Sequence, residues 1–388
     1  MLRSFLTVVL LVCSSVAFSQ APSRKDVDIS AADGTKLKAT FFSAGKPGPG
    51  VILLHMCNTT RISWEPVALA LSKQGINALT IDNRGFGESG GPRFDPTKPE
   101  VFRELNAHWP GDFDAAYDFL LLQPGVDKAR IGAGGGSCGV DNALKLAERH
   151  PDIKAMVLLA GGTDIAGVNF IAHRPEMPIF TAAAADDEFD AATIRIMQWF
   201  ADLSGNPRTK FSGFKDGKHG TEIFGPHPEL VQQIVAFLVD TLVTQPVNLK
   251  ASTLSRRTPA SEFWAAVNEH GGAEKASEVF HQARKRDPDA FVFPEFTVNL
   301  LGYARLQSGD KQEAITLFKL NTEAYPASAN TYDSLSDGYL AAGQNDLALA
   351  TEQKCLEQLP NDPGNAQFKE AIAKAAREKI EKLKAEQK

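Results

Sequence analysis

The sequence predicts two structural parts: an α/β domain with a mostly parallel sheet flanked by helices, and then an all-α domain of helical repeats. From about Val27 to Leu242, short apolar runs that are typical of buried strands alternate with amphipathic helical patterns. Such alternation indicates βαβ crossovers and strands that are buried on both faces. Beyond Val243 the pattern becomes helical, and residues recur at a spacing of 34. That period is typical of stacked helix–turn–helix repeats.

Length and charge narrow the range of functions. The chain has 388 residues and a formal net charge of −6. This length is sufficient for two domains with packed cores. The acidic balance gives no reason to expect a nucleic-acid partner. No apolar run reaches the roughly 18 residues of a transmembrane helix, so we expect no membrane span.

The N-terminus has the order of a secretory signal peptide. An early Arg3 is followed by an apolar stretch from Phe5 to Val12 and then by small residues. We expect residues 1–19 to be removed by cleavage after Ser19, and the mature protein to be secreted or periplasmic. The alternative is an N-terminal helix that is buried in the fold.

The α/β domain is predicted at residues 25–245. An alternating pair of strands on either side of Ala32-Asp33-Gly34 indicates an antiparallel hairpin at one sheet edge, because Asp-Gly favours tight turns. The clearest strands of the parallel part are Gly50–Met56, Asn77–Asp82, Arg130–Gly135, Lys154–Ala160 and Met177–Ala185.

A stretch without periodicity at residues 246–260 is predicted to be a linker, and residues 261–388 are predicted to be helical repeats. Gly309 and Gly343 are 34 residues apart, and two prolines have the same spacing. This pattern resembles tetratricopeptide (TPR) repeats, in which glycine opens the turn between two helices and proline ends the second. The charged last helix is expected to cap the stack. The other interpretation of its end is a solvated tail.

A glycine-rich turn carries the strongest chemical signal. The sequence Gly135-Gly136-Ser137-Cys138-Gly139 follows a predicted strand and opens a predicted helix. It fits G-x-S-x-G, a strained strand-to-helix turn that exposes a nucleophile. Glycines two residues before and two after the nucleophile let strand and helix pass closely, which favours Ser137. With Cys138 as the nucleophile, Val140 would take the second glycine position and crowd the turn.

A nucleophilic serine needs a general base and a carboxylate that orients the base. In this kind of fold the chain order is serine, acid, histidine. Asp187 follows a predicted strand, and His219 precedes a C-terminal helix, so the order is met. Asp186 is the alternative acid. The competing interpretation of the glycines is a phosphate-binding loop, but the two partners favour the triad.

The spacing of potential metal ligands along the chain gives no reason to expect a bound ion. No cluster of His, Cys and carboxylate residues has metal-ligand spacing. We therefore expect neither a metal nor a cofactor.

An oxyanion hole requires two backbone N–H groups. One is expected from Cys138, the residue after the nucleophile, and the other from Cys57 or Met56 in the loop after an earlier strand. The two cysteines are then either partly buried thiols or a disulfide of an exported protein. With Cys355 the mature chain has an odd number of cysteines, so at least one thiol stays free or pairs with another chain.

Together these motifs resemble the α/β-hydrolase superfamily, and within it the dienelactone-hydrolase-like serine esterases. The resemblance implies an α/β-hydrolase fold, and it favours Asp187 as the acid because Asp187-Glu188-Phe189 fits the acid turn of the family. The chain departs from the family at His55-Met56, where His-Gly is usual. Met56 and Trp109 are candidates for the substrate pocket, and Trp109 has the alternative role of anchoring its loop on the core. The stretches that match are VILLHMC, IDNRGFGESGG, GGSCG, DDEFD and GKHGTE.

The sequence therefore predicts an exported serine hydrolase that cleaves small-molecule carboxylic esters through Ser137, His219 and Asp187. A serine peptidase or amidase on the same triad is the alternative, since nothing in the sequence decides the leaving group. A third interpretation is a protein in which the TPR-like repeats bind a peptide, a protein or a second copy of the chain, and the hydrolase domain is auxiliary.

Overall fold

The computed structural model describes residues 21–189, 192–250 and 255–386. The predicted signal peptide lies outside these residues. Within the described ranges, no helix combines the length and the apolar character that crossing a membrane would need.

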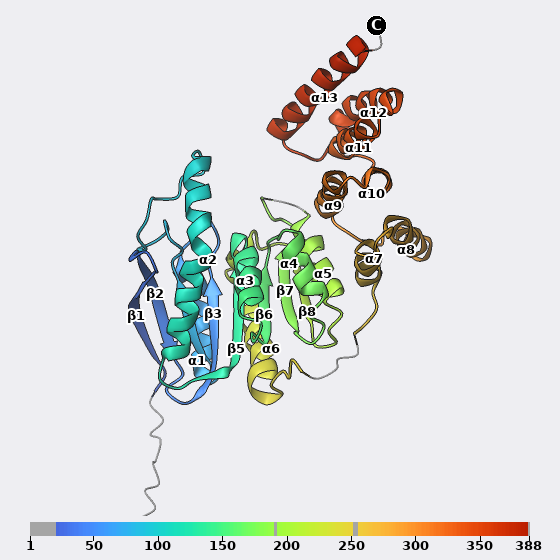
Figure 1. Cartoon of the computed structure of the whole chain (residues 1–388). Coiled ribbons are helices and arrows are strands. Elements are labelled where there is room, and N and C mark those ends of the chain that lie inside the picture. Colours follow the sequence, from blue (N-terminus) through green and yellow to red (C-terminus); the bar gives the residue numbers. More distant parts are fainter. Residues whose placement is uncertain (1–20, 190–191, 251–254, 387–388) are drawn as a thin grey trace, which may run out of the picture.

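An eight-stranded sheet forms the centre of the first part (Figure 1). The strands lie in the order β1-β2-β4-β3-β5-β6-β7-β8. The pairs β1–β2 and β2–β4 are antiparallel, and all other neighbours are parallel. The predicted edge hairpin and the mostly parallel sheet of an α/β-hydrolase fold are therefore confirmed. The strands are β1 (Ser23–Ser30), β2 (Lys36–Ser43), β3 (Gly48–Leu54), β4 (Asn77–Ile81), β5 (Val126–Gly136), β6 (Ala155–Leu159), β7 (Ile179–Ala184) and β8 (Lys210–Phe214).

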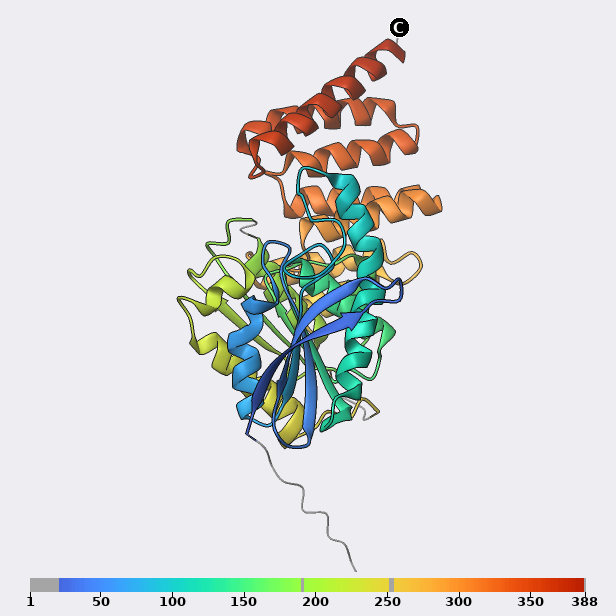
Figure 2. The same ribbon diagram turned by 90° about the vertical axis from the view of Figure 1, so that its left-hand side faces the viewer.

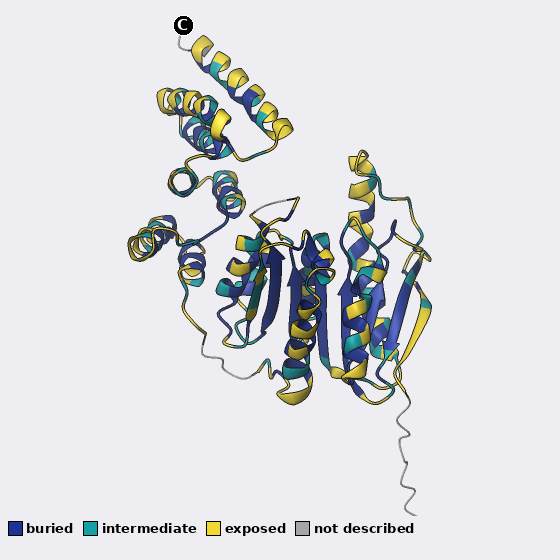
Figure 3. Cartoon of the chain, turned by 180° about the vertical axis from the view of Figure 1, so that it is seen from behind, coloured by how far each residue is buried: buried dark blue, intermediate teal, exposed yellow. Residues whose placement is uncertain are grey.

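Helices cover both faces of this sheet (Figure 3). Buried side chains of α2, α3, α4 and α5 form one apolar cluster with the sheet, and those of α1 and α6 form another on the opposite face. In β3, Ile52 and Leu54 belong to the first cluster, and Val51 and Leu53 to the second. Successive side chains of a strand point to opposite faces, so a strand covered on both sides is apolar throughout. The helices are α1 (Glu65–Lys73), α2 (Pro99–Leu122), α3 (Cys138–Arg149), α4 (Ile165–Ala172), α5 (Thr193–Ser204) and α6 (Glu229–Val239), with short turns at η1 (Arg61–Trp64), η2 (Gly220–Phe224) and η3 (Asp240–Thr244).

The second part, which we call the helical array, rises beyond the carboxyl edge of the sheet on the side of β7 and β8 (Figures 1 and 2). Helices α7 and α8, α9 and α10, and α11 and α12 pack as pairs. The starts of α9 and α11 are 34 residues apart, as are those of α10 and α12, in agreement with the period in the sequence. The first helix begins inside the stretch that was predicted to be a linker. The bounds are α7 (Pro259–Val267), α8 (Ala273–Arg286), α9 (Glu295–Ser308), α10 (Lys311–Ala324), α11 (Ala329–Ala341), α12 (Asn345–Gln358), η4 (Leu359–Asn361) and α13 (Ala366–Glu386).

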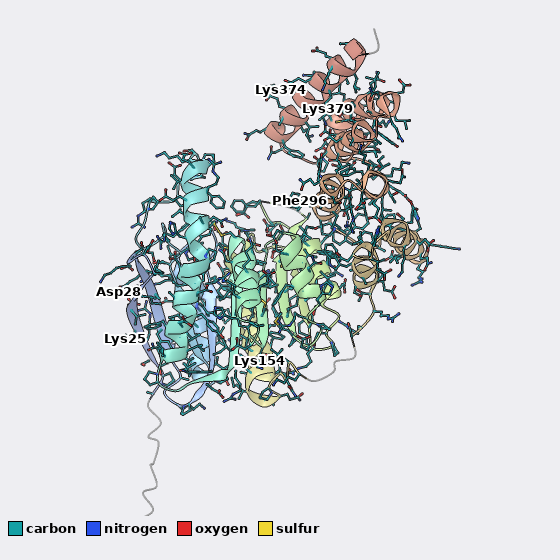
Figure 4. The ribbon with its side chains drawn as sticks, viewed as in Figure 1. Lys25, Asp28, Lys154, Phe296, Lys374 and Lys379 are labelled. Carbon is teal, nitrogen blue, oxygen red and sulfur yellow. A yellow bond between two sulfur atoms is a disulfide. The ribbon has the colours of Figure 1, made fainter. Side chains whose placement is uncertain are left out.

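The last helix, α13, packs on the array. Lys379 Nζ lies 2.9 Å from a carboxylate oxygen of Asp333 and 2.6 Å from one of Asp337, both on α11 (Figure 4). Leu383, near the end of the helix, is buried in one apolar cluster with Tyr339. These contacts hold α13 on the array as far as Leu383, whereas Glu381, Lys382, Lys384 and Ala385 are exposed.

The array and the α/β domain share an apolar core. Trp199 of α5 is fully buried, and its Nε1 donates a hydrogen bond of 2.8 Å to the carbonyl of Val292. The ring of Trp199 meets that of Trp264 on α7 with a centroid distance of 6.0 Å. Trp264 Nε1 in turn donates to Asn169 Oδ1 of α4 at 2.9 Å. Since both tryptophans belong to the cluster that covers the sheet, the two parts are held by packing as well as by the chain that joins them.

We expect Trp199→Ala to lower the free energy of unfolding by about 3–5 kcal/mol, because it leaves a cavity in the shared core and an unpaired carbonyl at Val292. Leu122→Ala is the matched control, since Leu122 is 74% exposed and should change stability by no more than about 0.5 kcal/mol. Urea denaturation of the two variants checks this. Equal effects would contradict a shared core.

Candidate active site

Ser137 lies at the turn between β5 and α3 with a strained backbone. Its φ of 53° and ψ of −123° put it where non-glycine residues are rare. The glycines around it are required sterically. A Cβ at Gly135 would lie 1.8 Å from the carbonyl oxygen of Gly139, and one at Gly139 would lie 2.5 Å from that of Leu54. The turn therefore has the geometry that the G-x-S-x-G pattern predicts, with Ser137 at its apex.

Asp187 and His219 form a buried pair. His219 Nδ1 is 2.7 Å from Asp187 Oδ2, and the two side chains are 8% and 0% exposed. Asp187 Oδ1 also accepts a bond of 3.0 Å from the Phe189 amide. Asp186 instead binds the backbone, since its Oδ1 accepts a hydrogen bond of 2.9 Å from the amide of Lys218. Of the two candidate acids, Asp187 is thus the one that meets the imidazole.

The aromatic ring of Phe189 also contacts the imidazole, with a centroid distance of 4.6 Å to His219. The side chain is 63% exposed. In the sequence, Phe189 served only to align Asp187 with the acid turn of the family. No local pattern indicates the ring contact, because the two residues are 30 positions apart.

Met56 and Trp109 do not line an open pocket, which corrects the prediction for both. Met56 is fully buried, and its sulfur accepts a bond of 3.4 Å from the Thr221 amide. A Cβ at Gly220 would lie 2.2 Å from that sulfur. Trp109 is 1% exposed and donates from Nε1 to the Arg84 carbonyl at 3.2 Å. Met56 packs against the loop that carries His219, and Trp109 anchors α2 on the core.

Cys57 and Cys138 form a disulfide, with an S–S distance of 2.18 Å and a Cα–Cα distance of 5.9 Å. Of the two states left open by the sequence, the structure has the bonded one, while Cys355 is a free, buried thiol. The sulfur of Cys138 is therefore not available as a nucleophile. Its amide belongs to the first turn of α3, where N–H groups have no partner within the helix and favour negative charge.

His55 orients the peptide bond that carries the Cys57 amide. The imidazole is fully buried, and burial lowers its pKa to about 4. Asn83 N–H donates to Nε2 at 2.9 Å, so the ring proton is on Nδ1, which is 2.6 Å from the Met56 carbonyl oxygen. Carbonyl and N–H point in opposite directions across a trans peptide bond. The contact to Met56 therefore aims the N–H of Cys57 away from His55.

A hollow of about 420 Å³ opens beside Cys57. Its walls include the aromatic rings of Phe86 and Phe94, which stack at a centroid distance of 4.9 Å. Thr59, Thr60 and other residues of the loops after β3 and β4 complete the lining. The hollow thus adjoins the predicted oxyanion loop and has one apolar side.

One group among the described residues has donor atoms close enough for a metal ion, and it lies far along the chain in the helical array. The donor atoms of Asp333, Glu352 and Cys355 are within 4.8 Å of one another. Lys379 Nζ lies 2.9 Å from Asp333 and 3.2 Å from Glu352, so an ammonium already supplies the positive charge there.

Comparisons with known proteins place the matching region in the α/β domain. The family described as BAAT / acyl-CoA thioester hydrolase C terminal matches residues 112–213, which include Ser137 and Asp187 but not His219. The thiohydrolase apmlB of Arthrinium phaeospermum is 33% identical over 135 residues, which is 34% of this chain and 41% of that protein. Esterase YjfP of Escherichia coli is 24% identical over 181 residues, which is 44% of this chain and 69% of that protein.

A solved structure, the Pyrococcus furiosus esterase Pf2001, covers 56% of this chain and 92% of its own, with 21% identity and a TM-score of 0.44. The chain spans about half the length of the curated relatives it matches. The similarity to proteins named as esterases and thiohydrolases supports the prediction of an esterase-like hydrolase.

We expect Gly139→Ala to lower the free energy of unfolding by about 1–3 kcal/mol, because the new methyl group would meet the Leu54 carbonyl and push α3 away from β3. Gly111→Ala is the control. Nothing lies within 4 Å of a Cβ there, and alanine stabilises a helix such as α2 by about 1 kcal/mol relative to glycine. Thermal denaturation of both variants measures the difference. If Gly139→Ala were as stable as Gly111→Ala, the close approach at the turn would be refuted.

Proposed function

We propose that the protein is an exported serine hydrolase that cleaves carboxylic esters, including thioesters, through Ser137, His219 and Asp187. The observation that carries the proposal is the buried Asp187–His219 pair, in a fold that also holds Ser137 in a strained turn at the end of β5. A strained backbone at a serine is a cost that a purely structural turn does not need. The relatives named as thiohydrolase and esterase support the same chemistry.

In the proposed reaction, Ser137 Oγ attacks the acyl carbon while His219 takes its proton. Asp187 holds Nδ1–H, which leaves Nε2 as the base and stabilises the imidazolium that forms. The amides of Cys138 and Cys57 donate to the oxyanion of the tetrahedral intermediate. His219 then protonates the leaving group. In the second half of the reaction, His219 takes a proton from water, the water attacks the acyl carbon, and His219 returns the proton to Ser137 as the acid product leaves.

The acyl portion is proposed to lie in the hollow beside Cys57. This hollow adjoins the oxyanion loop, and its aromatic side suits a hydrophobic chain. The match to an acyl-CoA thioester hydrolase family favours acyl thioesters as a second substrate class for the same site. A peptidase or amidase on this triad remains the alternative.

Export is proposed from the first 19 residues, and the disulfide is in keeping with an oxidising compartment. We also propose that the helical array is a TPR-like module that binds a peptide or protein, or a second copy of the chain. Phe296 of α9 supports this role. It is 65% exposed and lies on the side of the array that faces the α/β domain (Figure 4).

We expect a fluorophosphonate probe to label the wild-type protein, and Ser137→Ala to lose both labelling and activity on p-nitrophenyl esters. Asp187→Asn should lower kcat about 10⁴-fold, because the imidazole then takes the wrong tautomer. Asp186→Asn is the matched control and should keep kcat within about tenfold, since Asp186 binds only a backbone amide. An unlabelled wild type would refute the proposal. Activity on matched anilides would favour the amidase.

We expect Phe94→Ala to enlarge the hollow and to favour longer acyl groups. The ratio of kcat/KM for p-nitrophenyl octanoate to that for the acetate should rise roughly threefold to tenfold. Phe368→Ala is the control, because Phe368 lies on α13 and is 43% exposed. An unchanged ratio in Phe94→Ala would show that the acyl group binds elsewhere.

A further inference from the structure

We propose that the Cys57–Cys138 disulfide is a positioning device that fixes the two oxyanion amides relative to each other, so that an oxidised pair is needed for full catalytic rate. The inference rests on the proposed function, because it assigns a role within that reaction. Its basis is the location of the disulfide, which bridges the two loops that are expected to supply the amide donors.

The two cysteines are brought together by strand pairing. Leu54 at the end of β3 lies opposite Gly135 of β5 in parallel register. Cys57 and Cys138 each follow three residues after their partner in that pair. The chain leaves the sheet at both points and turns in different directions, into a loop after β3 and into α3 after β5. The disulfide joins these two exits just above the sheet.

The two sides of the disulfide differ in how firmly they are held. Cys138 begins α3, and the close approach of Gly139 to Leu54 fixes that helix on β3. Cys57 begins a short loop that is anchored next by the Arg61 amide, which donates to Asp82 Oδ1 at 2.7 Å. Between these points the loop turns through local hydrogen bonds, such as that from Thr59 N–H to the Met56 carbonyl at 3.1 Å.

His55 and the disulfide fix different properties of the Cys57 amide. The bond from His55 to the Met56 carbonyl sets the direction of the N–H, as described above. It does not set the distance from this N–H to the amide of Cys138, since His55 bonds to the loop after β4 and not to α3. The covalent link between the two residues sets that distance.

Two amides stabilise an oxyanion only if both reach the same point, at about 2.7–3.1 Å from it. Reduction adds two electrons and two protons to the sulfur pair, and a dithiol reductant is oxidised to its own disulfide. The two thiols that result each need their own van der Waals space, so the loops that carry them must separate. A displacement of about 1 Å in an active site lowers a rate by about 10²-fold.

Both cysteines are partly exposed, and Cys57 lines the hollow beside the site. A small reductant can therefore reach the disulfide in the folded protein. Cys355 is buried in the array, and burial raises the pKa of its thiol to about 12, so it does not exchange with the pair.

The test compares Cys57→Ser and Cys138→Ser with Cys355→Ala, which should keep wild-type activity. Each serine variant retains both backbone amides but loses the link. We expect kcat on p-nitrophenyl esters to fall roughly tenfold to a hundredfold, with KM changed less than about threefold. The affinity for an alkyl trifluoromethyl ketone, which forms an oxyanion on Ser137, should fall by the same factor as kcat. If the disulfide only stabilised the fold, its loss would lower the melting temperature but leave kcat and the ketone affinity unchanged.

Reduction of the folded wild type with a dithiol provides a second measurement if a serine variant does not fold. The mature protein should present one thiol when it is denatured without reductant and three after reduction. Activity should fall on reduction and return on reoxidation, while near-UV circular dichroism confirms that the fold persists.

The outcomes separate the two proposals. Failure of fluorophosphonate to label the wild type would refute the proposed serine-hydrolase function. Full labelling, together with wild-type kcat and ketone affinity in both serine variants or after complete reduction, would overturn only the role of the disulfide.

Discussion

The parallel pairing of β3 with β5 is the contact on which the candidate active site depends. It places Leu54 opposite Gly135, and so it brings the exits of two strands to one point of the carboxyl edge. The approach is close because glycine occupies the turn after β5, where a Cβ on Gly139 would collide with the Leu54 carbonyl. The strained serine, the disulfide and both expected oxyanion amides all lie within a few residues of this pair.

Backbone strain is concentrated at the same edge. Among the described residues, the non-glycine positions with positive φ are Ser137, Ala160 and Lys218, which lie after β5, after β6 and beside His219. Such conformations persist only where the surrounding structure holds them. Here the buried core on both faces of the sheet provides that support. Ion pairs strengthen the neighbouring loops, as Arg84 shows in its 2.7 Å contact with Asp112 of α2.

The helical array packs directly on the helix that follows the acid turn. Thr193, near Asp187 in the chain, begins α5, and α5 carries Trp199 into the shared core. Arg195 on the same helix lies over the ring of Phe291 at 4.4 Å from its centroid. The helix that follows the acid turn is thus in direct contact with the array.

Much of this was predictable because it depends on local pattern. Apolar runs, turn glycines and the 34-residue spacing indicated the sheet, the elbow and the paired helices. The prediction was wrong where burial decides, as for Met56 and Trp109, since a large apolar side chain has the same sequence signature in a pocket wall and in a core. The contact of Phe189 with His219 was not predicted, because it joins two loops that are distant in sequence.

The sequence by itself determined the type of chemistry and its order along the chain: a serine between glycines, then an acid, then a histidine. Only the tertiary structure decided which of two adjacent carboxylates meets the imidazole, and whether the sulfur atoms of Cys57 and Cys138 are bonded. The reason is physical. Spacing along a chain fixes which residues share a turn or a helix face, but the distance between loops on different strands is set by the register of the sheet and the packing beneath it.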